Sequence, residues 1–267
     1  MIVQTAPEGV PRFVIRMAEH TALSDRFADA FGNEKFEPVA DSETRFIIAN
    51  HDAGWSALDA EFRIDPATGY PYNLIETPFE LVMGTSRGSP DFNEAHHPFS
   101  GLLSSMHSWG LYNGRYGLSD IVLLDKVGQQ NAPVAEKMLA HEQERQARLK
   151  ETLRADPDRR HKVDDDHLMQ SYKQLQLFDT LALYFNRIHE GAREEAVFQH
   201  VPMAAAEDAD VTVTPMDGGT YRVTPWPFAG DELTVTFEGR YMPPDPDGAI
   251  DGSSLPVETQ TVTLIAG

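Results

Sequence analysis

The sequence predicts an α+β protein that is mainly α, a helical bundle with an N-terminal β-hairpin and a C-terminal antiparallel β subdomain. Between residues 17 and 190, apolar residues recur every three or four positions in several segments, as on one face of a helix. Two β-rich runs flank the Pro7-Glu8-Gly9 turn, and beyond about residue 195 apolar and polar residues alternate, as in half-buried strands. We therefore expect residues 1–194 to form the helical body with its hairpin, and residues 195–267 to form a β-rich subdomain packed on it.

Several segments have the apolar periodicity and the length of helices. Gly32-Asn33 supplies a C-terminal stop for the first, and Ser42 is a candidate N-cap for the second, whose apolar run leads into His51-Asp52. The expected helices cover residues 17–31, 42–54, 99–112, 133–155 and 168–190. Residues 59–98 are rich in Pro, Gly and Asn, so we expect a long loop with a short helix near residues 79–83. Loops of this length often line a binding site.

The C-terminal segments alternate in a way that is typical of strands, and Asp217-Gly218-Gly219 is a hairpin turn. The expected strands cover residues 211–213, 221–223, 233–237 and 261–265. The N-terminal hairpin is expected to join their sheet, because neither group of strands buries much surface alone. The rigid aromatic segment Pro225-Trp226-Pro227-Phe228 is expected to pack the strands onto the helical body.

Composition excludes several classes of function. The chain has 267 residues, no cysteine and a formal net charge of −20. Thiol catalysis and disulfides are therefore impossible, and so negative a surface repels nucleic acid and anionic membranes. No run approaches the roughly 20 apolar residues that span a bilayer, and no signal peptide is evident, so we expect a cytoplasmic protein. A small anionic substrate remains compatible, because a bound metal reverses the local field.

Ionisable residues interrupt the predicted apolar helices. His20, the adjacent pair His51-Asp52, His107 and Asp179 each lie in or next to an apolar run. An unpaired buried charge costs several kcal/mol or more, so side chains of this kind on separate helices suggest one shared site. Imidazoles and carboxylates are ligands for divalent Mn, Fe, Zn or Mg. The alternative is that these residues are hydrogen-bonded members of the core.

The order of these residues resembles the HD-type metal-dependent phosphohydrolase superfamily, in which a His, an adjacent His-Asp and a distant Asp lie on helices. The resemblance implies an HD-like helical bundle with His20, His51, Asp52 and Asp179 as metal ligands. Some branches continue their central motif with Gly and then Lys, whereas this chain has Gly54-Trp55.

The whole chain also resembles an uncharacterised bacterial family, a domain of unknown function. This resemblance implies an architecture but no reaction. It is carried by the hairpin leading to His20 and by residues 51–55, 65–71, 174–179 and 225–228.

These observations predict a metal-dependent hydrolase of a small phosphorylated substrate, with metal-activated water as nucleophile. Asp52 would orient the water, His107 would donate a proton or bind a second ion, and Arg63 or Arg87 would contact the anion. The first alternative is an HD-type di-iron oxygenase with His97 and His107 as second-metal ligands. The second alternative is a non-catalytic binding protein with a buried polar network.

Overall fold

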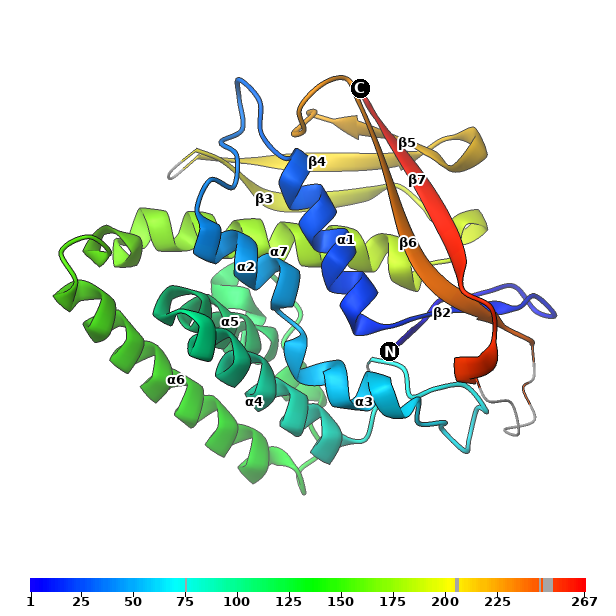
Figure 1. Cartoon of the computed structure of the whole chain (residues 1–267), viewed down its shortest axis with the longest axis horizontal. Coiled ribbons are helices and arrows are strands. Elements are labelled where there is room, and N and C mark those ends of the chain that lie inside the picture. Colours follow the sequence, from blue (N-terminus) through cyan, green and yellow to red (C-terminus); the bar gives the residue numbers. More distant parts are fainter. Residues whose placement is uncertain (75, 205–206, 245, 247–251) are drawn as a thin grey trace.

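A layer of helices packs against one curled β-sheet (Figure 1). The computed structural model describes residues 1–74, 76–204, 207–244, 246 and 252–267. The α-helices are α1 Met17–Ala30, α2 Ser42–Asn50, α3 Ser56–Glu61, α4 Phe79–His96, α5 Pro98–Tyr112, α6 Ala132–Ala155 and α7 Asp165–Arg187. The strands are β1 Ile2–Val3, β2 Arg12–Ile15, β3 Ala196–Ala204, β4 Glu207–Pro215, β5 Thr220–Thr224, β6 Glu232–Met242 and β7 Glu258–Ala266.

The strands form a seven-stranded mixed sheet in the order β1-β2-β6-β7-β5-β4-β3. Neighbours are antiparallel except β5 and β7, which pair in parallel with Thr220 opposite Thr263. The N-terminal hairpin joins the sheet at β6, where Phe13 is opposite Tyr241. In Figure 1, β6 and β7 cross the direction of β3 and β4, so the sheet curls into a half-barrel with α1 against β6 and α7 against β3.

The expectation of a mainly helical HD-like bundle with an antiparallel β subdomain is wrong. Strands make up 21% of the structure and helices 52%, so the sheet is a full layer of the fold. The N-terminal and C-terminal strands share that sheet, as expected, and the β5–β7 pair makes it mixed. Local alternation identified most of the strands, but pairing between distant segments decided that they form one curled layer.

The long loop expected over residues 59–98 is also shorter than predicted. α4 begins at Phe79 and continues through Pro90 to His96. Glycine and proline are poor helix formers, so Gly84, Gly88 and Pro90 made this segment resemble a loop. Tertiary packing overrides that preference, because Met83 and Asn93 are buried against neighbouring elements.

The aromatic segment near the C-terminus packs as expected. Phe228 is buried, and its ring lies 6.2 Å from that of Phe27 and 6.3 Å from that of Phe31, both in or next to α1. A backbone bridge also joins Phe31 to Phe228. The contact connects the sheet to the helix that carries His20. Within the described ranges, none of the helices has the length and apolarity needed to span a membrane.

Candidate metal centre

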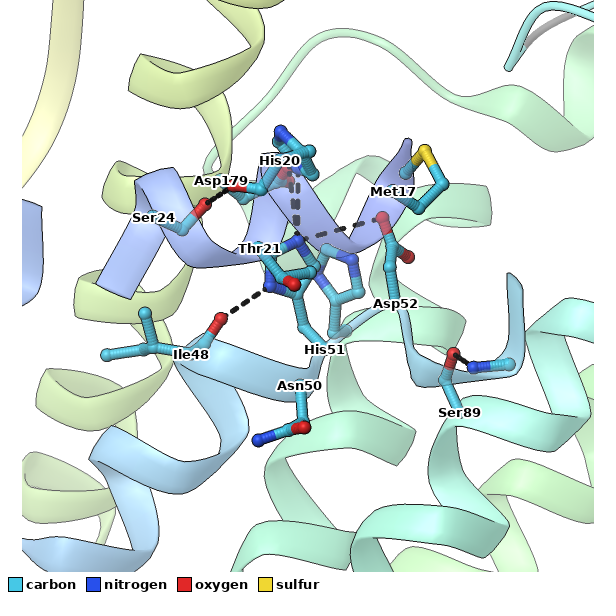
Figure 2. Close-up of polar contacts among 12 residues, drawn as sticks. Met17, His20, Thr21, Ser24, Ile48, Asn50, His51, Asp52, Ser89 and Asp179 are labelled. Carbon is cyan, nitrogen blue, oxygen red and sulfur yellow. Dashed lines mark hydrogen bonds and ion pairs between the residues drawn. The ribbon is translucent and has the colours of Figure 1, made fainter. Parts of the chain in front are cut away.

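Four of the predicted site residues, His20, His51, Asp52 and Asp179, come together from distant parts of the chain (Figure 2). His20 lies in α1 and Asp179 in α7, and both side chains are almost completely buried. His51 and Asp52 lie just beyond the end of α2, and His107 lies in α5. Burial of this many ionisable groups requires that they satisfy one another or a bound ion.

His51 and Asp52 occupy a corner rather than the middle of a helix. α2 ends at Asn50, and Asp52 is the N-cap of η1 (Ala53–Trp55), with φ −106° and ψ 23°. The Asn93 side chain donates to the carbonyl of Asn50 (3.0 Å), which satisfies the end of α2. Neighbouring helical side chains diverge by about 100°, so the turn is what lets both side chains face one point.

Glycine is required where this corner meets α4. A Cβ on Gly54 would lie 2.4 Å from the carbonyl oxygen of Thr85 and 2.7 Å from the backbone nitrogen of Ser89. The close approach lets Ser89 Oγ accept a hydrogen bond from Gly54 N at 3.0 Å (Figure 2). Gly88 lies opposite, where a Cβ would be 3.2 Å from the Gly54 Cα. This contact holds the His51-Asp52 corner against α4.

The two imidazoles point their Nε2 atoms at each other. His20 Nε2 lies 3.2 Å from His51 Nε2, and Asp179 Oδ1 lies 3.2 Å from the first nitrogen and 3.7 Å from the second. Asp52 Oδ2 lies 3.7 Å from His51 Nε2. Atoms that bind one ion at about 2.0–2.2 Å lie roughly 3.0–3.6 Å apart. His20, His51 and Asp52 offer ligand atoms within 4.8 Å of one another, so this group could hold a metal ion.

The other ring nitrogens determine where the lone pairs point. His51 Nδ1 lies 2.9 Å from the carbonyl of Ile48, and His20 Nδ1 lies 3.1 Å from Asn186 Oδ1. Both oxygens only accept, so Nδ1 carries the hydrogen in each ring. The Nε2 lone pairs of neutral rings would then face each other and the Asp179 carboxylate. Such an arrangement requires a positive charge between them, either a proton or a metal ion.

The electrostatics of the His/Asp cluster, which consists of His20, His51, Asp52 and Asp179, agree with this requirement. Burial acts to lower the pKa of His20, but the hydrogen bond and negative charge of Asp179 outweigh it and raise that pKa. Burial acts to raise the pKa of Asp179, yet the His20 hydrogen bond and the Arg115 charge hold it well below its usual range. Burial raises the pKa of Asp52. The raised pKa of His20 and the lowered pKa of Asp179 both favour a positive charge between these two side chains.

His107 lies beside the cluster. Its ring centroid is 5.4 Å from that of His51, and its Nδ1 is 3.0 Å from Gln176 Nε2. Burial lowers the pKa of His107 to about 3, so the ring is neutral near pH 7. A neutral imidazole suits a metal ligand or a hydrogen-bond partner better than the proton donor that the sequence suggested.

His97 has different surroundings. It is the N-cap of α5, where its Nδ1 accepts a hydrogen bond from Phe99 N at 3.1 Å, and its Nε2 lies 3.4 Å from Glu43 Oε1. Its contacts are therefore with the start of α5 and with α2, not with the His/Asp cluster.

The cluster opens into a cavity of about 830 Å³ lined in part by His51, Asp52, His107 and Asp179. Leu74 and Thr77, from the segment before α4, form part of its wall. Arg63 and Arg87, the arginines expected to contact an anion, are not among the described lining residues, and Arg63 pairs with Glu61.

The basic residues that do line the cavity are Arg115, Lys126, Lys173 and Arg187. None of these four residues was predicted from the sequence to contact a ligand. For Arg115 the sequence does contain a feature that marks an unusual backbone position. Arg115 lies in Gly114-Arg115-Tyr116-Gly117, and two glycines around a short segment are typical of a tight turn.

The comparisons with known proteins identify a family but no reaction. The family described as "Protein of unknown function (DUF3891)" matches residues 1–244. The chain therefore belongs to this family, which confirms the expectation of an uncharacterised family. Neither the comparison with curated proteins nor that with solved structures gave a match.

Proposed function

We propose that this DUF3891 member is a metal-dependent hydrolase of a small phosphorylated substrate. The observation that carries the proposal is the convergence of the His20 and His51 Nε2 atoms and the Asp179 Oδ1 atom, at separations of 3.2 and 3.7 Å, next to a cavity that His51 and Asp179 line. The two 3.2 Å separations match the edges of a metal coordination shell, and the 3.7 Å separation is slightly longer than such an edge. The adjoining cavity provides room for a substrate beside the ion.

In this proposal His20, His51, Asp52 and Asp179 hold a divalent ion, with Mn, Fe, Zn and Mg as candidates. Such an ion supplies an activated water and polarises a phosphoryl oxygen. Asp52, whose side chain is 16% exposed, is the ligand placed to accept a hydrogen bond from that water. Arg115 Nη2, 3.4 Å from Asp179 Oδ2, is placed to contact the substrate anion next to the ion.

The placement of the other histidines favours a hydrolase over the di-iron oxygenase. The second-iron site would need further imidazoles, and of the two that the sequence suggested only His107 lies beside the cluster. The non-catalytic alternative, a buried polar network, requires that a proton rather than a metal supplies the positive charge between the imidazoles. Metal binding distinguishes these cases.

The experiment has a binding arm and an activity arm. Purified protein is analysed for metal by elemental analysis, stripped with a chelator and titrated calorimetrically with Mn²⁺, Fe²⁺, Zn²⁺ and Mg²⁺. Phosphate release is then measured with a panel of phosphate esters. We expect about one ion per chain, and metal-dependent turnover of at least one ester.

Variants identify the ligands. His51→Ala should abolish metal binding and turnover, whereas the control His97→Ala should retain both, since His97 contacts Phe99 and Glu43. Thermal unfolding of each variant checks that it is folded. Wild-type protein that binds none of these ions, or a His51→Ala variant that binds them like wild type, contradicts the proposed function.

A further inference from the structure

The cavity next to the His/Asp cluster is much larger than a phosphate group. Its volume of about 830 Å³ lies in the range of sites that enclose a whole drug-sized ligand, about 300–1,000 Å³. The ionisable ligand-type residues occupy only one part of its wall. The remaining wall therefore contacts a different part of the bound molecule.

That remaining wall is largely apolar. Phe79 and Val82 of α4, Leu111 of α5 and Leu123 and Val127 of the following segment all line the cavity. These same side chains pack on one hydrophobic cluster, formed by Met83, Tyr112, Met138 and Leu139. The apolar wall is thus backed by a packed core and is preformed.

Two further lining residues are unusually exposed. Ile121 is 61% exposed and Val197 is 54% exposed, and both border the same cavity although they come from distant segments. Exposed apolar surface next to a cavity is favourably covered by an apolar ligand. A purely ionic substrate would leave both side chains in water.

The charged part of the wall favours an anion. Four basic side chains and two carboxylates, Asp52 and Asp179, line the cavity, whereas the chain as a whole has a net charge of −20. Lys173 and Arg115 have acidic partners in Asp208 and Asp179. Lys126 and Arg187 form no ion pair with any residue that the structure describes. The lining therefore has two more basic than acidic side chains, opposite in sign to the net charge of the chain.

We propose that the substrate is an anionic amphiphile, with a phosphate head next to the His/Asp cluster and Arg115, and a hydrocarbon part along the apolar wall. This inference rests on the proposed function for the position of the head. The hydrocarbon part covers Ile121 and Val197 and packs against Phe79, Val82 and Leu111. The apolar wall, rather than the ion, then selects the substrate.

The test is calorimetric binding of a homologous series of n-alkyl phosphates, from ethyl to dodecyl, below their micelle concentrations. The series is titrated into the chelator-treated protein, which has no ion to drive turnover, and into the protein with added metal ion while phosphate release is measured in parallel. Each buried methylene contributes about 0.8 kcal/mol, so we expect the affinity to rise by up to about fourfold per methylene until the cavity is full. The matching n-alkyl carboxylates test whether the head must be a phosphate. Inorganic phosphate should bind more weakly than octyl phosphate by a factor of 100 or more.

Variants at the exposed lining residues test the site. Ile121→Asp and Val197→Asp should each weaken octyl phosphate binding about tenfold or more while leaving binding of inorganic phosphate within about threefold. Val134→Asp is the matched control, because Val134 is 45% exposed on α6 and lies outside the cavity lining. Affinity independent of chain length, or tripolyphosphate binding more tightly than octyl phosphate, overturns the inference and indicates a polyanionic substrate.

The outcomes separate this inference from the proposed function. A protein that binds metal and hydrolyses short esters, but shows no chain-length dependence, retains the proposed function and loses the amphiphile. A protein that binds long alkyl phosphates with the expected dependence, but no metal, retains the apolar site and loses the hydrolase.

Discussion

The buried carboxylate of Asp179 contacts Arg115 through one oxygen and the His20 imidazole through the other. Arg115 Nη2 lies 3.4 Å from Asp179 Oδ2, while Asp179 Oδ1 lies 3.2 Å from His20 Nε2. The arginine therefore orients the carboxylate so that its other oxygen faces the imidazoles. Partners of this kind around a metal ligand fix its direction and tune its charge.

An unusual backbone segment places Arg115 in this position. The four residues from Gly114 to Gly117, which form η2, all have positive φ, with values of 65°, 51°, 60° and 88° in chain order. A left-handed conformation costs about 1–2 kcal/mol for each residue that is not glycine. Arg115 and Tyr116 carry this strain, and the Arg115–Asp179 contact and the packing of Tyr116 on Trp109 and Tyr172 offset it.

Asp179→Asn should weaken metal binding by about 10–100-fold, because it removes the negative charge next to the proposed ion and leaves the side-chain shape unchanged. Calorimetric titration with Zn²⁺ and Mn²⁺ measures the effect. Asp217→Asn, in the exposed turn before β5, is the control and should bind metal like wild type. Equal metal affinity in Asp179→Asn and wild type would show that Asp179 acts only as a hydrogen-bond partner of His20.

Arg115→Met should weaken inorganic phosphate binding by about 10-fold or more, since a hydrogen bond to a charged group contributes about 1.5–3 kcal/mol. Metal affinity should change less, because Asp179 keeps its contact with His20. Calorimetry on the metal-loaded variant measures both. Arg154→Met, at an exposed position on α6, is the control. A phosphate affinity that stays at the wild-type value would move the anion contact to Lys126, Lys173 or Arg187.

Gly54→Ala should destabilise the protein by about 1–3 kcal/mol, because the new Cβ would lie 2.4 Å from the Thr85 carbonyl oxygen. The shift of the corner should also weaken metal binding. Gly84→Ala in α4 is the matched control, since its Cβ would meet no atom within 4 Å, and alanine favours a helix over glycine by up to about 1 kcal/mol. Denaturant unfolding of both variants gives the comparison. Equal stabilities would contradict the close approach of η1 and α4.

Asp41 should make stability depend on pH in the acid range. Burial acts to raise the pKa of Asp41, but hydrogen bonds with Glu43, Lys162 and Thr44, and the positive charge of Lys162, outweigh it and hold that pKa well below its usual range. A depressed pKa contributes stability that is present above the unfolded value of about 4 and is lost as the pH falls below it.

The measurement for Asp41 is the difference in free energy of unfolding between wild type and Asp41→Asn across pH 2–7. Asparagine is also a good N-cap, so the difference reports the carboxylate charge and its contact with Lys162. We expect wild type to be more stable at pH 6 and the difference to shrink as the pH falls from about 4. A constant difference over this range would argue against the depressed pKa.

Much of the candidate site was predictable from residue types and spacing. His20, His51 and Asp52 were identified because polar ionisable residues rarely occupy apolar helical runs, and the structure brings them within 4.8 Å of one another. His97 looked equally suitable as a ligand, but it caps α5 and contacts Glu43. Helical periodicity shows which face of a helix is buried, but it does not show what that face meets.

The sequence by itself determined the identity of the ligand-type residues, the helical segments that carry His20, His107 and Asp179, and the net charge that makes a basic cavity unusual. The tertiary structure alone decided that the shared sheet is curled and mixed, that residues 79–96 are helical despite Pro90, and that Arg115 reaches Asp179. The physical reason is the range of the interactions. Propensity and periodicity act over a few residues, whereas strand pairing, the Gly54–Gly88 approach and the cavity depend on contacts between distant segments.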